Sequence, residues 1–290
     1  MQDDRPSTTA FRAAVARARH QLIDTPKVFD DPLALRILGP ETALELERLG
    51  RRGDNPYLRG VRASLVARSR ITEDALHEAV AHGATQYVVL GAGLDTFALR
   101  SPYSAARLRV FEVDHPATQS WKRQLLARAG LVVPAHLHWV PVNFGRQSVG
   151  EALLDAGFDP ARPAFFSWLG VTMYLPPEVT LATLRELSGL ARAGGGIVFD
   201  VLNDPATLNP LLRLMLAVLR RRFARMGEPW IGHFAPEPLR TALQAMGFAD
   251  VRRHDAHNVN PRFFDSHPRG LRMRTLGSIV QASLPSRFAT

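Results

Sequence analysis

The sequence predicts an α/β protein built on a mostly parallel, seven-stranded sheet in a three-layer α/β/α sandwich, with added N-terminal helices and a helical insert. Three observations predict this fold. From residue 86 onward, short apolar runs alternate with helical stretches, a pattern typical of a parallel sheet covered on both faces. The first apolar run ends on the glycine-rich turn Gly91-Ala92-Gly93. The residues before it, 1–83, have helical periodicity.

The N-terminal part is expected to contain four helices after a frayed start. Thr9 is the expected N-cap of the first helix, and Pro32 stands at the first position of the second. His82-Gly83 ends the long amphipathic helix that comes last. The expected ranges are 9–22, 33–38, 41–49 and 58–81.

The rest of the chain supplies the sheet and its covering helices. The expected strands are 86–90, 109–113, 138–142, 164–168, 196–201, 250–254 and 278–283. The expected helices between them are 116–128, 149–156, 177–191 and 236–246.

A long helical stretch, about 205–226, interrupts this alternation and is followed by Gly-Glu-Pro-Trp-Ile-Gly-His-Phe. Because inserts at the carboxyl end of a strand lie over the crevice of an open α/β sheet, we interpret residues 205–235 as a lid. The expected organisation is a single domain, 1–290. Its core comprises 84–204 and 236–290, and 1–83 form a helical part of the cover.

Composition excludes several function classes. The 290 residues are 46% hydrophobic and 22% charged and contain no cysteine, which excludes disulfides, thiolate zinc sites and cysteine nucleophiles and fits a cytoplasmic protein. The net charge of +9 comes from dispersed arginines, so no nucleic-acid partner is expected. No membrane-spanning run or secretory signal is visible. His136 and His138 stand alone at a strand entry, and no metal site is expected.

The turn Gly91-Ala92-Gly93 indicates a nucleotide-type cofactor site. Two glycines one residue apart let the backbone turn tightly and approach a ligand, although such a pair also occurs for turn geometry alone. A dinucleotide-binding fingerprint needs a third glycine or alanine where this chain has Thr96. The turn therefore argues against a dinucleotide.

Two further strand ends carry polar residues. Asp114 ends the second strand about twenty residues after the glycine turn, where a carboxylate can accept hydrogen bonds from ribose hydroxyls. Glu112 lies on the same face of the strand and is the alternative ribose contact. Asp114 is also a reasonable N-cap for the helix that starts at Pro116. At the third strand end, Asn143 suits an adenine amino group, and a Phe144 ring can pack on the base. Together these features describe an adenosine site without a pyrophosphate.

This arrangement resembles class I methyltransferases, which share a Rossmann-like fold. The chain is most similar to the leucine carboxyl methyltransferase family, including its bacterial and polyketide-tailoring members. The resemblance spans nearly the whole chain. Its carriers are FDDPLALRIL, ARSRITED, VVLGAGLDTFALR, VFEVDHPATQSWK, PVNF, SWLGVTMYLPPE, GEPW and RFFDSHPRGLR.

The resemblance implies that S-adenosyl-L-methionine is the cofactor and assigns its contacts. Arg68 matches the arginine that pairs with the methionine carboxylate. The remaining implied contacts are the backbone at Gly91, Ala92 and Gly93, the ribose at Asp114, and the adenine at Asn143 and Phe144. The chain departs from the family at Asn143, where aspartate is usual, and at Leu169, where leucine carboxyl methyltransferases carry glutamate. The second departure puts their phosphatase-methylating activity in doubt.

The resulting function hypothesis is O-methylation of a small molecule, with polyketides and other secondary metabolites as candidates. A carboxylate is the first acceptor considered, and a phenol or alcohol is the second. A carboxylate needs no general base, whereas a phenol benefits from one, for which the candidates are His115, Tyr174 and His233. Candidate substrate contacts, whose alternative role is lid packing, are Arg222, Trp230, Phe234 and Phe264, with Arg100, Arg225 and Phe263 also considered. The sequence leaves the oligomeric state open.

Two other enzyme classes remain as alternatives. The first is a non-methylating cyclase or rearrangement catalyst that keeps the fold and the cofactor, which the departures at Asn143 and Leu169 motivate. The second is a nicotinamide-dependent oxidoreductase, against which Thr96 argues.

Overall fold

The computed structural model describes residues 8–144, 146–267 and 270–285, so the expected frayed start lies outside the described residues. Seven strands in this described part form one sheet, in the order β3-β2-β1-β4-β5-β7-β6. β7 pairs antiparallel with β5 and β6, and all other pairings are parallel. The predicted mostly parallel α/β fold is confirmed. The strands are β1 (Gln86–Leu90), β2 (Arg109–Asp114), β3 (Leu137–Pro141), β4 (Ala164–Trp168), β5 (Gly195–Leu202), β6 (Ala249–His254) and β7 (Gly277–Leu284).

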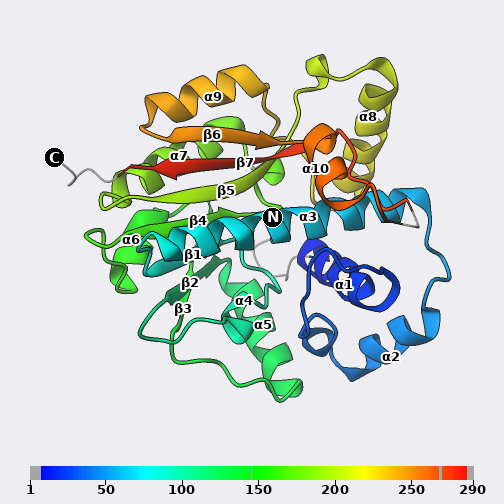
Figure 1. The fold of residues 1–290 in the computed structure, drawn as a ribbon, viewed down its shortest axis with the longest axis horizontal. Coiled ribbons are helices and arrows are strands. Elements are labelled where there is room, and N and C mark those ends of the chain that lie inside the picture. The colour runs from blue at the N-terminus through cyan, green and yellow to red at the C-terminus, as the bar shows by residue number, and fades with distance from the viewer. Residues whose placement is uncertain (1–7, 145, 268–269, 286–290) are drawn as a thin grey trace.

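Each face of the sheet carries its own apolar core, because successive side chains of a strand point to opposite faces. Val88 and Leu90 pack with one core, which includes residues of the helices α6, α7 and α9. Tyr87 and Val89 pack with the other, against the helices α3, α4 and α10. Figure 1 shows α3 crossing one face of the sheet while α7 and α9 lie on the other. The covering helices are α4 (Phe97–Arg100), α5 (Pro116–Arg128), α6 (Val149–Asp155), α7 (Pro177–Leu190), α9 (Pro236–Ala245) and α10 (Ala256–Phe263).

Two of these helices were absent from the sequence prediction. α4 is only four residues long, which is too short to show a periodic pattern. α10 contains Pro261, which sequence rules treat as a helix breaker. It forms nevertheless, because Asp255 and Asn258 make a reciprocal capping box at its start.

Three of the N-terminal helices lie close to their predicted ranges, but the predicted helix 33–38 is only a three-residue 3₁₀ helix, preceded by turns at 32–35. The N-terminal helices are α1 (Thr8–Ile23), η1 (Arg36–Leu38), α2 (Pro40–Leu49) and α3 (Pro56–Ala81). α1 already includes Thr8, so Thr9 lies in its first turn and is not the N-cap. α3 begins two residues earlier than expected, because the Asn55 side chain accepts hydrogen bonds from the backbone N–H groups of Tyr57 and Leu58.

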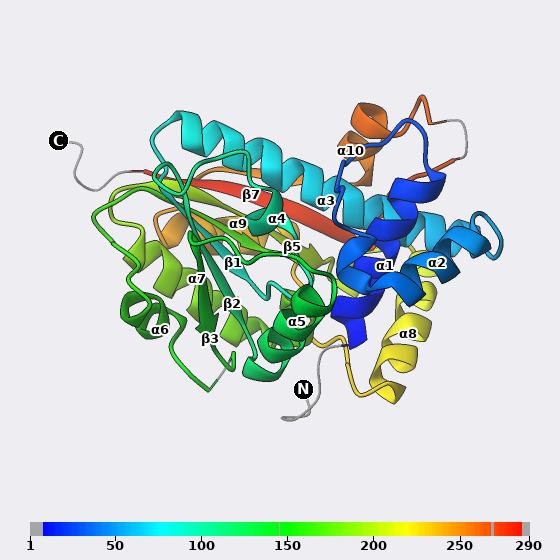
Figure 2. The ribbon, with the colours of Figure 1, turned by 90° about the horizontal axis from the view of Figure 1, so that it is seen from below.

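The insert contains η3 (Pro205–Thr207) and α8 (Pro210–Arg225), and Asn209 caps α8. A bridge between Asn203 and Phe234 ties the two ends of the insert together. Figures 1 and 2 both place α1 and α8 beyond one end of the sheet. None of the helices in the described ranges is long and apolar enough to cross a membrane.

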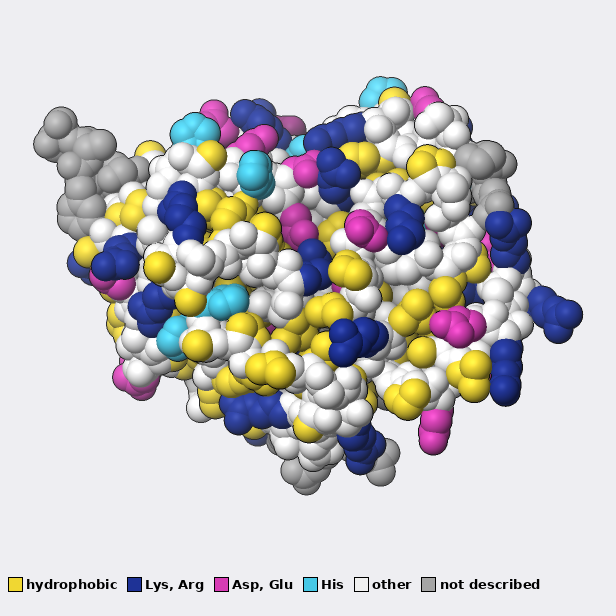
Figure 3. Space-filling view, turned by 60° about the horizontal axis from the view of Figure 1, so that its bottom comes forward, with side chains coloured by type: hydrophobic (Ala, Val, Ile, Leu, Met, Phe, Trp, Pro, Cys, Tyr) yellow, Lys and Arg dark blue, Asp and Glu magenta, His cyan; other side chains and the backbone are white. Residues whose placement is uncertain are grey.

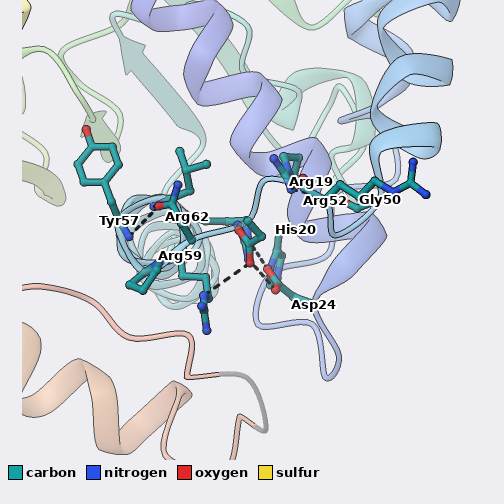
Figure 4. A network of polar contacts seen from close by, with 12 residues as sticks. Arg19, His20, Asp24, Gly50, Arg52, Tyr57, Arg59 and Arg62 are labelled. Atoms are coloured by element: carbon teal, nitrogen blue, oxygen red, sulfur yellow. Dashed lines mark hydrogen bonds and ion pairs between the residues drawn. The ribbon is translucent and has the colours of Figure 1, made fainter.

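A buried polar network fixes α1 against α3, and Figure 4 shows it from close by. Arg62 of α3 donates from Nε to Asp24 Oδ2 at 2.5 Å and from Nη1 to Asp54 Oδ1 at 2.8 Å. His20 Nδ1 lies 2.9 Å from Asp24 Oδ2. His20 Nε2 accepts hydrogen bonds from the backbone N–H groups of Val28 and Phe29, so the proton sits on Nδ1. Because each partner satisfies the next, this network holds the N-terminal helices in one position.

Candidate functional site

A cavity of about 1090 Å³ lies at the carboxyl ends of β1, β2, β4 and β5. The chain leaves β1 towards β2 on one side while β4 lies on the other, so this is the point at which open α/β sheets bind ligands. Residues of α1, α3 and the insert close the cavity on its other sides.

The glycine turn forms one wall of the cavity and needs both of its glycines. Gly91 has a φ of +64°, and a Cβ there would lie 2.2 Å from Cγ2 of Val171. Gly93 has a φ of +49°, and a Cβ there would lie 3.0 Å from Cβ of Ala10 in α1. The turn is therefore packed between η2 (Thr172–Tyr174) and α1, which leaves its backbone facing the cavity.

Asp114 lines the cavity and is held by two backbone groups. Its Oδ2 accepts the N–H of Gly93 at 2.5 Å, and its Oδ1 accepts the N–H of His115 at 2.6 Å. Burial raises the pKa of Asp114 above its ordinary value, and these two hydrogen bonds offset only part of that rise. A rigid carboxylate at this position retains lone pairs towards the cavity. The cap of α5 is His115, whose Nδ1 accepts from Ala117 N, so the alternative role of Asp114 as that cap is wrong.

Glu112 does not line the cavity. It lies one pleat below Asp114, with 1% of its surface exposed, and its Oε2 accepts from Lys122 Nζ of α5 at 2.6 Å. Burial raises the pKa of Glu112 to about 7, although Lys122 lowers it. Of the two carboxylates considered for the ribose, only Asp114 reaches the cavity.

Asn143 and Phe144 both line the cavity, beyond the end of β3. The Phe144 ring stacks on Trp168 of β4 with centroids 5.9 Å apart. This contact keeps a flat apolar surface beside Asp114 and the glycine turn. Asn143 is positioned through its backbone N–H, which donates to Gln147 Oε1 at 2.9 Å.

Arg68 of α3 lines the cavity and is paired with Asp200 of β5. Its Nη1 donates to Asp200 Oδ2 at 2.6 Å, and Asp200 Oδ1 accepts the N–H of Gly170 at 2.6 Å. Gly170 has a φ of +75°, and a Cβ there would lie 2.8 Å from Arg68 Nη2. The sequence interpretation missed Asp200. The signal was present, since Asp200 is a carboxylate near the carboxyl end of an apolar strand, two residues before β5 ends.

Contacts between α1 and the segment after α8 join two parts of the cavity lining. The Thr9 hydroxyl donates to Glu228, and the Tyr174 hydroxyl donates to Thr9 Oγ1 at 3.3 Å. Burial raises the pKa of Tyr174, so its phenol stays protonated near neutral pH. Trp230 lines the cavity and stacks on Phe223 of α8, with centroids 4.2 Å apart.

Several residues proposed from the sequence as substrate contacts lie elsewhere. Phe234 and Phe264 are 8% and 1% exposed. Phe234 packs in the core on one face of the sheet and Phe264 in the core on the other. Phe263 packs beside the second of these cores. Arg100 is paired with Glu73 and lies over Phe29.

The proposed general bases are also displaced from the cavity. His115 is engaged in capping α5, and His233 lies with Nδ1 3.2 Å from the carbonyl oxygen of Ile231. Neither lines the cavity, and nor does Arg225. Of the three candidate bases, only Tyr174 lines the cavity. Of the first four candidate substrate contacts, Arg222 and Trp230 line it.

The charged lining contains more arginines than carboxylates, although Arg17 and Arg62 are paired with carboxylates outside it. Among the described residues that line the cavity there is no histidine or lysine. The lining includes four carboxylates, from Asp95, Asp114, Asp200 and Glu228, and eight arginines, namely Arg12, Arg17, Arg19, Arg62, Arg68, Arg146, Arg222 and Arg274. On the outer face in Figure 3, by contrast, basic side chains are scattered among apolar and acidic ones. No group of side chains in the described ranges is suited to hold a metal ion.

The residues present fit S-adenosylmethionine. A wall without Cβ atoms at Gly91 and Gly93, a fixed carboxylate at Asp114 and a flat ring at Phe144 suit an adenosyl group. A guanidinium at Arg68 suits a carboxylate. The cavity also exceeds the needs of one such ligand, since pockets that enclose drug-sized ligands hold roughly 300–1,000 Å³.

Comparison with known proteins agrees with this geometry. The family model described as leucine carboxyl methyltransferase matches residues 10–188. YktD of Bacillus subtilis, whose name places it among S-adenosyl-L-methionine-dependent methyltransferases, is 31% identical over 286 residues, covering 92% of this chain and 94% of the relative. A Saccharopolyspora erythraea protein named in the same way is 37% identical over 196 residues, which is 66% of each chain.

Among solved structures, that of a Thermobifida fusca protein titled as a methyltransferase aligns with 97% of this chain and 96% of its own. The TM-score is 0.56 and the identity 18%. At that sequence identity the match shows a shared fold and nothing further.

Proposed function

Because the chain belongs to the leucine carboxyl methyltransferase family and is an S-adenosylmethionine-dependent methyltransferase, we propose a substrate class for it. The proposed reaction is methylation of a carboxylate oxygen of a small organic acid. The observation that carries the proposal is the cavity lining, which has eight arginines, four carboxylates and, among the described residues, no histidine. An acid is already ionised at neutral pH and needs no base. A phenol or alcohol would need a proton acceptor, and the four carboxylates of the lining already accept hydrogen bonds from other groups of the protein.

The cofactor contacts are part of the proposal. We assign the methionine carboxylate to Arg68 and the ribose hydroxyls to Asp114, whose carboxylate two backbone N–H groups hold in place. Asn143 and Phe144 are assigned to the adenine, and Gly91, Ala92 and Gly93 form the surface against which the cofactor rests. When bound, S-adenosylmethionine supplies an electrophilic methyl group: the bond to the acceptor oxygen forms as the bond to sulfur breaks, leaving the electron pair on sulfur.

Asp200 is assigned as a positioning residue. It binds Nη1 of Arg68 and is itself fixed by Gly170 N–H, so the guanidinium has one orientation before any ligand arrives. Such preorganisation lowers the entropic cost of binding. The remaining donors of Arg68 are then available to a second carboxylate, because a guanidinium carries five N–H groups.

We further propose that residues 1–83 and 205–235 form the cover over a single catalytic domain. This division is supported by the cavity residues that α1, α3, α8 and the segment after α8 contribute. Closing the cavity excludes water from the reacting oxygen, and a less hydrated carboxylate is a stronger nucleophile. The expected partner is a small molecule.

The test is an assay with methyl-tritiated S-adenosylmethionine and paired acceptors, each an aliphatic or aromatic carboxylic acid with the matching phenol or alcohol. Methyl esters release tritiated methanol in alkali, whereas methyl ethers do not. The proposal expects alkali-labile product from acids. Alkali-stable product from the phenols or alcohols alone would contradict it.

A further inference from the structure

The substrate end of the cavity contains an arginine that neither the cofactor contacts nor the sequence motifs use. Arg274, in the segment before β7, lines the cavity. Its Nη1 lies 3.5 Å from Met215 Sδ of α8, and its Nη2 lies 3.4 Å from the carbonyl oxygen of Pro56. Both contacts are long and the sulfur is a weak acceptor. Within the described part of the chain, no carboxylate lies at ion-pair distance from Arg274.

The backbone of α3 makes room for this guanidinium. Gly60 is a buried residue in the interior of α3, where glycine costs about 1 kcal/mol relative to alanine. A Cβ at position 60 would lie 2.9 Å from Arg274 Nε and 3.2 Å from its Cδ. The glycine therefore lets the arginine lie flat against the helix and reach the cavity.

The position of Arg274 along α3 separates it from the cofactor site. Gly60 precedes Arg68 by eight residues, which is about 12 Å of helix at 1.5 Å per residue. Arg68 marks the amino-acid end of the cofactor under the proposed assignment. The surface around Arg274 is apolar: Tyr57, Met215, Leu219, Met273 and Leu276 also line the cavity.

From these observations, and resting on the proposed function, we propose that Arg274 binds an anionic group at the far end of the acceptor. The acceptor class is then an apolar molecule that presents an oxygen to the cofactor at one end and carries a carboxylate, sulfonate or phosphate at the other. Arg274 is half-buried, so fewer water molecules screen its guanidinium than screen a fully exposed one, which favours such an anion. Arg222 also lines the cavity but is exposed on α8, where solvent weakens its attraction.

The experiment compares two dyes that differ only by a sulfonate group, 8-anilino-1-naphthalenesulfonate and the neutral N-phenyl-1-naphthylamine. Each is titrated by fluorescence against the full chain saturated with S-adenosylhomocysteine. We expect Arg274→Ala to weaken binding of the sulfonate about tenfold, the loss of one charge-assisted hydrogen bond, and to leave the neutral dye unchanged. Arg274→Lys, which keeps the positive charge, should retain part of the affinity for the sulfonate dye.

Two further variants separate binding from folding. Gly60→Ala removes no charge but displaces Arg274, so it should lower the affinity for the sulfonate dye and not for the neutral one. The unfolding temperature of the protein should not fall, because alanine is a better helix residue than glycine. Arg272→Ala makes the same charge change on an exposed side chain paired with Asp265, outside the cavity, and should bind both dyes as the wild type does.

The inference is overturned if the wild type does not bind the sulfonate, or if Arg274→Ala affects both dyes equally or neither. It is also overturned if Arg222→Ala, and not Arg274→Ala, lowers sulfonate affinity. None of these readouts depends on methyl transfer. A failure of the proposed carboxylate chemistry would therefore appear separately, in the tritium assay.

Discussion

Arg68 and Asp200 stand 132 residues apart in the sequence and meet at the cavity, with Arg68 Nη1 donating to Asp200 Oδ2 at 2.6 Å. Their side chains are only 16% and 12% exposed. A largely buried ion pair of this kind fixes a guanidinium in one orientation. The pair therefore prepares Arg68 to meet the carboxylate end of the cofactor.

Asp200→Asn should weaken S-adenosylhomocysteine binding about tenfold and leave 5′-methylthioadenosine binding unchanged. The second ligand has the same adenosyl group but lacks the amino-acid end, so it does not depend on Arg68. Asparagine can still accept from Gly170 N–H but loses the charge that orients the guanidinium. Isothermal titration calorimetry measures both affinities.

The matched control is Glu237→Gln, which removes an exposed carboxylate paired with Arg240 outside the cavity. It should bind both ligands as the wild type does. Equal losses for the two ligands in Asp200→Asn would show that Asp200 supports the fold rather than the orientation of Arg68.

Gly91→Ala should abolish measurable cofactor binding and lower the unfolding temperature. The new Cβ would lie 2.2 Å from Val171 Cγ2 at a φ of +64°, so both the neighbour and the backbone must shift. Gly83→Ala is the control, since Gly83 also has a positive φ, +103°, but no atom lies within 4 Å of its added Cβ. Gly83→Ala should lower the unfolding temperature but leave cofactor binding unchanged.

Adding Val171→Ala to Gly91→Ala should recover part of the unfolding temperature, because it removes the clash and leaves only the backbone cost. Differential scanning calorimetry makes this comparison. If the double variant is no more stable than the single one, packing against Val171 is not what requires glycine at position 91.

The ratio kcat/KM for an acid substrate should stay level between about pH 6 and 9. No histidine lines the cavity in the described part of the chain, and burial raises the pKa of Tyr174, which keeps its phenol protonated. Tyr174→Phe should change kcat less than about threefold, because it removes a hydroxyl that hydrogen-bonds to Thr9 and takes no proton from the acceptor. A bell-shaped profile, or a loss of a hundredfold or more, would instead indicate a base.

Acid should destabilise the protein through Asp24. Burial raises the pKa of Asp24, but the hydrogen bonds from His20 and Arg62 and the charge of Arg62 outweigh it and hold the pKa at about 2. A carboxyl group with a lowered pKa contributes stability above its unfolded pKa and loses it as the pH falls through the folded value. The free energy of unfolding should therefore fall between about pH 4 and 2.

Asp24→Asn should flatten that part of the profile and cost about 3–5 kcal/mol at pH 7, since Arg62 is left buried without its main partner. Asp30→Asn is the control, because Asp30 is exposed and pairs only with the exposed Lys27. Urea unfolding across the pH series measures both. An unchanged slope in Asp24→Asn would place the acid sensitivity elsewhere.

Local sequence signals predicted most of the fold because they act over a few residues. Apolar runs that end on Gly91 or Asp114 identify buried strands and the edge where a ligand binds, and they do so without knowledge of the partner strands. The strands β1 and β4 and the helix α5 lie at the ranges predicted. α4 and α10 were missed because the first has too few residues for periodicity and the second contains a proline.

Tertiary structure alone decided which polar and aromatic side chains face the cavity. Glu112 and Asp114 share one strand face, and only the packing of Lys122 from α5 removes Glu112 from the site. Phe234 and Phe264 enter the two cores instead of the cavity. Asp200 reaches Arg68, and Arg274 crosses Gly60, through contacts between segments far apart in the chain.

The sequence by itself thus determined the sheet, the glycine turn and the carboxylate at Asp114, which depend on the period of apolar residues and the geometry of one turn. The tertiary structure determined the orientation of Arg68, the absence of histidine from the described cavity lining and the arginine at its far end. The physical reason is that charge and burial depend on neighbours in space, and elements distant in sequence supply those neighbours.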